Sequence, residues 1–189
     1  MRKAEKGHIR ITSEYNNRLK TMRKLGYLDQ DNKLTERGHF LINVYSYELL
    51  VGEIFSTDIW KAFDPQMLLV VAAAIIYEER RKDKYVTKGG NQIVQRILDA
   101  CQKNDYVMRE LDKVALRRLA PLITRWASGA EFDQLLELTD SQEGDIIHLF
   151  RRTLDLLRQV KHAAHDEVLR DNISKAMALI DRDIIQVSL

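Results

Sequence analysis

The stretch Met67–Tyr77 is apolar at nearly every position, and this feature limits the possible folds more than any other. It follows Asp64-Pro65, a strong helix start, because aspartate accepts hydrogen bonds from the first unpaired amides and proline fits the first helical position. A helix that is apolar on all sides belongs at the centre of a bundle. Its 11 residues, followed by charges, are fewer than the roughly 18–20 that a membrane span needs. We therefore expect a buried helix.

The rest of the composition favours helices around this centre. The chain has only 8 glycines and 2 prolines among 189 residues, and its Val, Ile and Thr residues are scattered rather than alternating. Hydrophobic residues make up 45% and charged residues 31%, a balance typical of a folded globular protein. We predict one all-α domain over residues 1–189, a helical bundle with a leading segment at 1–45 and a main bundle at 64–187.

The first 55 residues predict short helices at residues 12–25, 36–46 and 48–55. Gly26 stands where a helix C′ residue is expected, and the Asp/Asn-rich segment 27–35 predicts a small hairpin-like turn. Thr35 can cap the second helix, and a break is expected near Ser46.

Further helices are predicted at residues 91–101, 106–126, 132–138, 141–164 and 165–187. We expect Pro121 to kink or restart the second of these, and Asp166 or a neighbour to lie at the corner between the last two. The charge run at 78–84 indicates a solvated helix end, and Lys88-Gly-Gly90 a flexible connection.

No sequence pattern indicates catalysis, a metal or a cofactor. The single Cys101 excludes an intrachain disulfide, no Cys/His spacing fits zinc, and no phosphate-binding glycine loop or DExH box occurs. The five histidines are not arranged with a nucleophile. The N-terminus lacks the apolar segment of a secretory signal, so we expect a cytoplasmic protein without a membrane partner.

The formal net charge of +2 is too small to indicate a nucleic-acid partner by itself. Residues 1–40 contain ten Lys/Arg and five Asp/Glu, whereas residues 131–145 contain six acids and no Lys or Arg. The charge is therefore polarised along the chain.

The predicted helix at 141–164 has two opposed faces. Asp140 and Glu143 are spaced as a capping box at its start. At 3.6 residues per turn, one face is apolar and predicted to be buried: Ile146, Ile147, Phe150, Leu154, Leu157, Val160 and Ala164. The opposite face, which we call the polar ridge, carries His148, Arg152, Asp155, Gln159 and His162.

A helix of about 24 residues extends roughly 36 Å, which is enough to follow several nucleotides of an extended strand. The pattern alone favours another interpretation, a solvated face with Arg151–Asp155 and Asp155–Gln159 as neighbouring pairs. Spacing does not decide between the two.

The segment EGDIIHLFRRTLDLLRQVKHAA at 143–164 resembles the signature helix of one protein family, the C-terminal (DSHCT) domain of superkiller-like and exosome-associated DExH-box RNA helicases. Further similar segments follow the family's order: RKLGYLD at 23–29, LTERG at 34–38, ELLVGEIF at 48–55, FDP at 63–65, YEE at 77–79, WASGAEF at 126–132 and IDRDII at 180–185. The resemblance covers about residues 18–187.

In this family the signature helix is a ratchet helix, whose polar side contacts the single strand leaving the helicase motor. The resemblance places RNA-contacting positions on Arg152 and Asp155, and we include Arg151, His148 and Gln159 in the predicted nucleic-acid-binding set. The implied partners are single-stranded RNA, with DNA possible, and a RecA-like helicase core. ATP and Mg²⁺ would belong to motor domains absent from this chain, and no cofactor is expected within it.

The chain departs from the family pattern in two ways. His148 stands where an arginine is usual, so the resemblance implies a weaker phosphate contact near neutral pH. Without the RecA-like domains, the chain is either a fragment of a longer helicase or a free-standing relative.

Two other functions remain open at this point. Residues 25–28 followed by 34–38 resemble a wing strand, which would suit a winged-helix regulator that binds duplex DNA. Alternatively, the domain is a structural scaffold whose polar ridge faces only solvent.

Overall fold

The computed structural model describes residues 14–79 and 83–186. Helical residues 14–24 are followed by α2 (Glu36–Leu41), α3 (Glu48–Phe55), the 3-10 helix η1 (Asp58–Ala62), α4 (Pro65–Ile76), α5 (Asn91–Cys101), α6 (Asp105–Glu110), α7 (Lys113–Ala127), α8 (Asp133–Leu136), α9 (Glu143–Ala163), α10 (Glu167–Ile180) and η2 (Asp183–Ile185). Some predicted helical positions, 12, 13 and 187, lie outside the described residues, as do 80–82 of the charge run.

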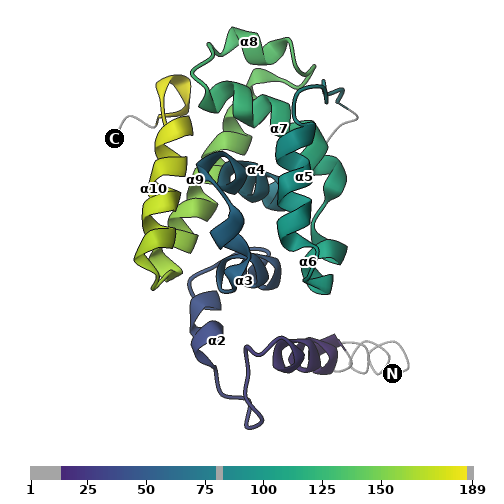
Figure 1. The fold of residues 1–189 in the computed structure, drawn as a ribbon, viewed down its shortest axis with the longest axis vertical. Coiled ribbons are helices and arrows are strands. Elements are labelled where there is room, and N and C mark those ends of the chain that lie inside the picture. The colour runs from purple at the N-terminus through teal and green to yellow at the C-terminus, as the bar shows by residue number, and fades with distance from the viewer. Residues whose placement is uncertain (1–13, 80–82, 187–189) are drawn as a thin grey trace, which may run out of the picture.

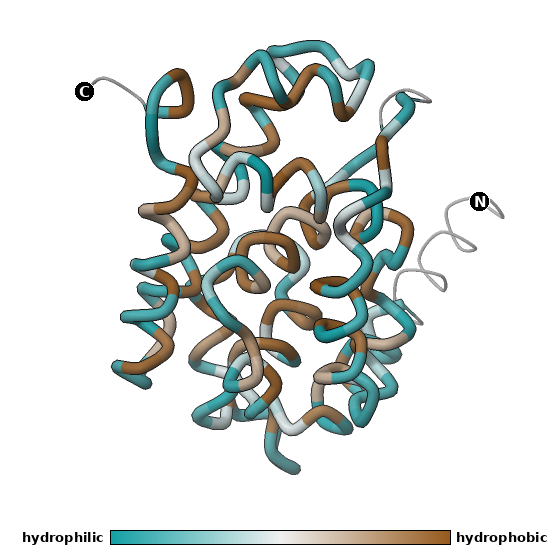
Figure 2. The backbone as a smooth tube through the Cα atoms, turned by 45° about the horizontal axis from the view of Figure 1, so that its top comes forward, coloured by the Kyte–Doolittle hydropathy of each residue, from teal (hydrophilic) through white to brown (hydrophobic). Residues whose placement is uncertain are grey.

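Helix α4 lies at the centre of the bundle, as predicted. Asp64 caps it, with Oδ1 accepting from the Met67 amide at 2.9 Å, and every residue from Met67 to Ile76 is buried. Helices α7, α9 and α10 pack around it (Figure 1). Coloured by hydropathy, the backbone of this inner region is largely apolar (Figure 2). An element apolar on every side thus organises the fold, because burial of its surface requires neighbours all round.

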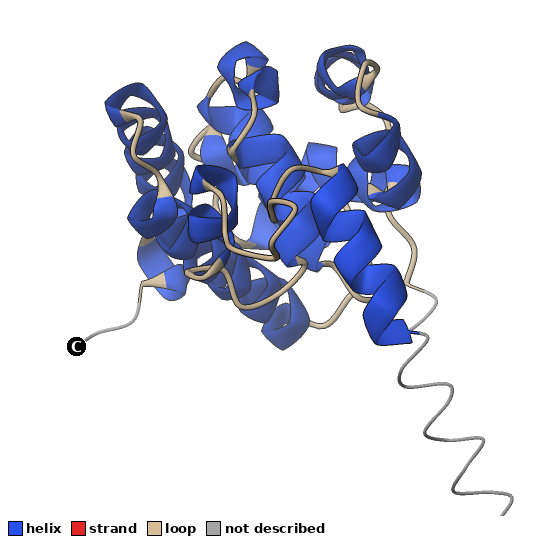
Figure 3. Ribbon diagram, turned by 90° about the horizontal axis from the view of Figure 1, so that it is seen from below, coloured by secondary structure: helices blue, strands red, loops and turns tan. Residues whose placement is uncertain are grey.

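The all-α class is confirmed. Helices joined by loops make up the described residues, and the only β pairing among them is two isolated bridges, Leu28 with Leu34 and Tyr85 with Thr139 (Figure 3). The first bridge closes the predicted hairpin-like turn, in which Asp29 Oδ1 accepts from two amides at 2.8 and 2.9 Å. The division into a leading segment at 1–45 and a main bundle at 64–187 stays a prediction.

Two predicted helix boundaries are wrong. Helix α2 ends at Leu41 rather than Ser46, and residues 42–47 form a loop. The predicted helix 106–126 is interrupted at Leu111-Asp112, where Asp112 caps α7 by accepting from the Val114 and Ala115 amides. Pro121 lies inside α7 without a break. The helix is interrupted at Asp112, because its side chain accepts the hydrogen bonds of the first amides of α7. Pro121 lacks one amide donor, but the helix continues through it.

The later helices are shorter than predicted. Segment 132–138 contains only α8, and the described part of segment 165–187 divides into α10 and η2. Asp166 lies at the predicted corner, where it caps α10. The division follows Ile180, where the Arg182 guanidinium lies over the Trp126 ring at 3.6 Å and donates to the Trp126 carbonyl at 2.9 Å. This contact holds the segment after α10 against α7.

A buried carboxylate connects the N-terminal segments to the bundle. Glu53 on α3 accepts from the Tyr27 hydroxyl at 2.8 Å, from Arg37 Nη2 at 2.6 Å and from Asn104 Nδ2 at 2.7 Å. We call these four residues the Glu53 cluster. Burial, and then the hydrogen bond to Glu53, raise the pKa of the Tyr27 hydroxyl, so this hydroxyl stays protonated and donates well into the alkaline range.

Candidate nucleic-acid interface

Helix α9 begins differently from the prediction. Asp140 does not cap it: its side chain accepts from the Lys84 amide at 2.6 Å, and the N-cap position, Gln142, makes no side-chain bond. Asp140 is instead used to hold the segment after α4 beside the start of α9. Glu143 and Asp145 in the first turn still interact favourably with the positive end of the helix dipole.

The apolar face of α9 is buried and wider than predicted. Of the predicted stripe, Ile147 is half-buried and the other members are buried. The structure adds Thr153, Leu156 and Ala163 to the buried face. The face is wider because α9 packs against four neighbours, α2, α4, α10 and η2.

The polar ridge faces outward along its whole length. His148, Asp155 and His162 are exposed, and Arg152 and Gln159 are half-buried. The periodicity therefore predicted the orientation of this face correctly. Helix α9, with 21 residues, is about 32 Å long, and the ridge from His148 to His162 covers about 21 Å of that length.

The partners within the ridge differ from those expected for a self-contained solvated face. Asp155 pairs with Arg158 at 2.8 Å. Gln159 Oε1 accepts from the backbone amide of Tyr45 at 2.9 Å, and Arg152 Nη2 lies 3.6 Å from Glu78 Oε1. Two ridge residues are thus connected to segments far away in the sequence.

Arg151 has a different role in the structure. Its guanidinium donates to the carbonyls of Ile185 and Ile184 at 3.2 and 3.1 Å, so it attaches η2 to α9. Among the predicted binding residues, the structure therefore brings His148, Arg152, Asp155 and Gln159 onto one face and gives Arg151 a contact with the C-terminal segment.

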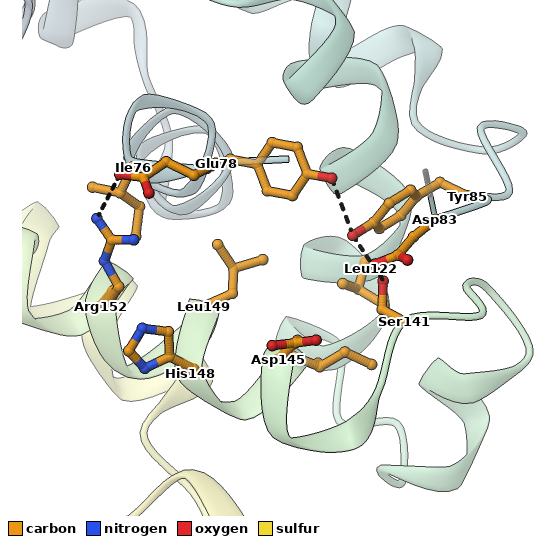
Figure 4. Close-up of a pocket in the computed structure, with 12 residues that line it drawn as sticks. Ile76, Glu78, Asp83, Tyr85, Leu122, Ser141, Asp145, His148, Leu149 and Arg152 are labelled. Atoms are coloured by element: carbon orange, nitrogen blue, oxygen red, sulfur yellow. Dashed lines mark hydrogen bonds and ion pairs between the residues drawn. The ribbon is translucent and has the colours of Figure 1, made fainter. Parts of the chain in front are cut away.

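A small cavity adjoins the ridge between the end of α4 and the first turns of α9. It has a volume of about 50 Å³ and is lined by residues that include His148, Leu149 and Arg152 (Figure 4). On its other side, the Ser141 hydroxyl lies 2.9 Å from both the Tyr85 hydroxyl and the Asp83 carboxylate, to which it can donate. Small-molecule sites usually enclose about 300–1,000 Å³. The exposed ridge, and not this cavity, is therefore the candidate interface.

Three residues beside the ridge are not predicted by the sequence pattern. Glu78 was interpreted as part of a solvated helix end, but its carboxylate accepts from the Tyr47 hydroxyl at 3.3 Å as well as facing Arg152. Tyr45 and Tyr47 lie in the loop that was predicted to be mostly helix. The signal that could have found them is a pair of aromatic residues on either side of Ser46, at the predicted break.

Burial and the neighbouring Glu78 carboxylate raise the pKa of the Tyr47 hydroxyl, so this phenol remains a hydrogen-bond donor to a higher pH than a free tyrosine does.

Within the described residues, no group of three or more His, Cys, Asp or Glu side chains could hold a metal ion. Across the same residues, no helix is long and apolar enough to cross a membrane.

The fold and the ridge define a class: an all-helical domain built on one central apolar helix, with a long second helix that presents a polar face. The chain belongs to the DSHCT (NUC185) domain family, whose model matches residues 31–188.

Its relatives include three helicases. It is 26% identical to the "ATP-dependent RNA helicase mtr4" of Schizosaccharomyces pombe over 91% of this chain, and 22% identical to the "Antiviral helicase SKI2" of Saccharomyces cerevisiae over 94%. It is 28% identical to the "Probable helicase HelY" of Mycobacterium tuberculosis over 83%. The chain spans 17%, 15% and 20% of these relatives, respectively, and so corresponds to a limited part of each.

Proposed function

We propose that this chain is the RNA-facing accessory domain of an ATP-dependent DExH-box RNA helicase. The polar ridge of α9 contacts the single strand that leaves the motor, and the domain couples ATP-driven motion of the RecA-like core to movement of the strand. ATP and Mg²⁺ belong to that core, and the proposed location is the cytoplasm. DNA is a possible substrate in place of RNA.

The observation that carries the proposal is Arg152, a half-buried arginine on the outward face of α9 whose acidic neighbour, Glu78, is 3.6 Å away. Charge-assisted hydrogen bonds are usually about 2.7–2.9 Å. The guanidinium is held in place along the ridge, yet its contact with Glu78 is loose enough to be exchanged for a phosphate or a base. Family membership and the named helicase relatives support RNA as the ligand.

A test is the binding of single-stranded RNA by the full chain and its Arg152→Ala variant. We expect weaker binding and a salt slope shallower by about one unit, because one ionic contact is lost. Arg170→Ala is the matched control, since Arg170 is also a helical arginine with one acidic partner, Glu167 at 3.3 Å. Equal binding by the wild type and the Arg152 variant would contradict the proposal.

The scaffold alternative makes a different prediction in a helicase that contains this domain together with its motor. Replacing Arg152 and Asp155 together with alanine should slow unwinding if the ridge touches the strand. Wild-type unwinding by this double variant would favour a purely structural role. The winged-helix alternative gains no support, because the segment 27–35 contains one isolated bridge and no longer pairing.

A further inference from the structure

Two tyrosines with exposed surface lie in a loop that is bonded to the polar ridge. The loop 42–47 between α2 and α3 carries Tyr45, which is 76% exposed, and Tyr47, which is 40% exposed. Neither ring contributes to the hydrophobic core. Packing of the hydrophobic core therefore does not explain why aromatic side chains occupy these positions.

The loop is fixed to the ridge at two points. At one, the Tyr45 amide donates to Gln159; at the other, the Tyr47 hydroxyl donates to Glu78, which faces Arg152. Arg152 and Gln159 are seven residues apart on α9, about 10 Å along its axis. The loop therefore borders the ridge over about that length, and the Tyr47 hydroxyl reaches Glu78 beside it.

Tyr47 adopts a conformation that suits other residues better. Its φ of 54° and ψ of 33° lie in the left-handed region, where glycine and asparagine are favoured over bulky side chains. Strained conformations of this kind persist where the surroundings impose them, and they are concentrated at functional sites. A tyrosine here holds its ring beside Glu78 and the ridge at the cost of that strain.

The charges beside the ridge nearly balance. Arg152 faces Glu78, and Asp155 pairs with Arg158. A near-neutral surface attracts phosphates weakly. Stacking of unpaired bases on aromatic rings does not depend on charge in this way, and each stacked base strengthens binding by about 5- to 150-fold.

We propose that Tyr45 and Tyr47 form a base-stacking platform for single-stranded RNA alongside the polar ridge. The proposal rests on the function proposed above and specifies its chemistry: the interface holds unpaired bases by stacking, and phosphate charge has a smaller part. Bases already stacked within a duplex are not available to these rings, so the platform selects single strands.

Nuclear magnetic resonance titration of the full chain tests this proposal and detects even millimolar affinities. The probes are an oligouridine of about eight nucleotides and an abasic RNA of equal length. Tyr45→Ala and Tyr47→Gly should each weaken oligouridine binding by about tenfold and leave abasic binding nearly unchanged. Tyr45→Phe, which keeps the ring, should bind like the wild type, and so should the control Tyr15→Ala, which removes a tyrosine that is 61% exposed in the helical segment 14–24.

Glycine suits the left-handed conformation at position 47, so Tyr47→Gly removes the ring while leaving the backbone free to keep its course. Raising the salt from about 50 to 200 mM should weaken oligouridine binding by less than about tenfold, against a thousandfold or more for a site with many phosphate contacts.

The outcomes separate the two proposals. If Arg152→Ala weakens oligouridine binding but both tyrosine variants bind normally, the ridge function stands and the stacking platform is overturned. Equal weakening toward the abasic RNA also overturns it, because the rings would then act on the backbone. If no resonances of the ridge or loop shift up to millimolar RNA, both proposals fail. Normal RNA binding by the tyrosine variants, combined with lost association with a helicase core, would assign the rings to a protein contact instead.

Discussion

Glu53 and Glu78 each join segments that are far apart in the chain, but they do so in opposite ways. The Glu53 side chain is 5% exposed, and both of its oxygens accept short hydrogen bonds, at 2.6 to 2.8 Å, from three partners. The Glu78 side chain is 57% exposed, and one oxygen makes longer contacts with Tyr47 and Arg152, at 3.3 and 3.6 Å. We call these last three residues the Glu78 cluster.

The difference separates a contact that holds the fold from one that a ligand can replace. A buried carboxylate must be fully paired, because leaving it unpaired costs several kcal/mol. An exposed one keeps water as an alternative partner, so its ion pairs contribute little to stability. The Glu53 cluster is therefore structural. The Glu78 cluster holds Tyr47 and Arg152 near the ridge through weak contacts that a ligand can replace.

The largest effect is expected for Glu53→Ala. This substitution leaves Arg37 and Asn104 without their buried acceptor, and we expect a loss of about 3–5 kcal/mol in the free energy of unfolding. Urea denaturation followed by far-ultraviolet circular dichroism measures it. Glu110→Ala is the control, since Glu110 forms an exposed pair with Arg109 at 2.8 Å and should change stability by less than about 1 kcal/mol. Equal losses in the two variants would contradict the distinction.

Two glycines near these regions offer a second comparison. A Cβ added at Gly52 would lie 2.5 Å from both Leu41 Cδ2 and the Tyr27 hydroxyl, whereas one added at Gly144 in the first turn of α9 would meet nothing within 4 Å. Overpacking should make Gly52→Ala destabilising by about 1–3 kcal/mol. Gly144→Ala should be neutral or stabilising by up to about 1 kcal/mol, because alanine is the better helix former.

Both glycine variants can be measured in the same urea denaturation experiment. A Gly52→Ala protein as stable as the wild type would show that the packing around the Glu53 cluster can adjust, and would weaken the view of this region as rigid.

The sequence was sufficient for features determined by nearby residues. The caps at Thr35 and Asp64 follow from local hydrogen bonding, and the central position of α4 follows from the apolar run. The orientation of the polar ridge follows from helical periodicity. Each of these features depends on residues only a few positions apart, so it does not depend on which distant segments pack nearby.

The features that the sequence did not predict depend on distant partners. Asp140 has local neighbours that suit a helix cap, but it bonds the Lys84 amide, 56 positions away. The loop at 42–47 is held by Gln159, 114 positions away, where local pattern predicted a helix. For the same reason the ridge could be predicted from α9 alone, but Tyr45, Tyr47 and Glu78 could not.

The two clusters also contain tyrosines that should differ at alkaline pH. Burial raises the pKa of both Tyr27 and Tyr47, more strongly for Tyr27. Above about pH 10 the unfolded state releases the Tyr27 proton and the folded state keeps it, so the free energy of unfolding should fall by at most about 1.4 kcal/mol per pH unit.

Denaturation at several values between about pH 9 and 11 should show a shallower decline in Tyr27→Phe than in the wild type. Tyr47→Phe should change the slope less, because its hydroxyl is more exposed. Identical slopes in all three proteins would mean that the Tyr27 proton does not contribute to alkaline unfolding.

The smallest effect is expected for the Glu78 cluster itself. A double-mutant cycle with Glu78→Gln and Arg152→Ala should give a coupling energy below about 1 kcal/mol in the free energy of unfolding, because the Glu78 side chain is 57% exposed and the closest atoms of the pair are 3.6 Å apart. The matching cycle with Glu53→Gln and Arg37→Ala should give a larger value, since those charges are 2.6 Å apart and Glu53 is buried. If the Glu78 pair proved as strongly coupled as the Glu53 pair, Arg152 would have to break a strong contact before it could bind RNA. A weak coupling instead means that the chain keeps Arg152 in position at little cost and leaves its guanidinium available to a strand.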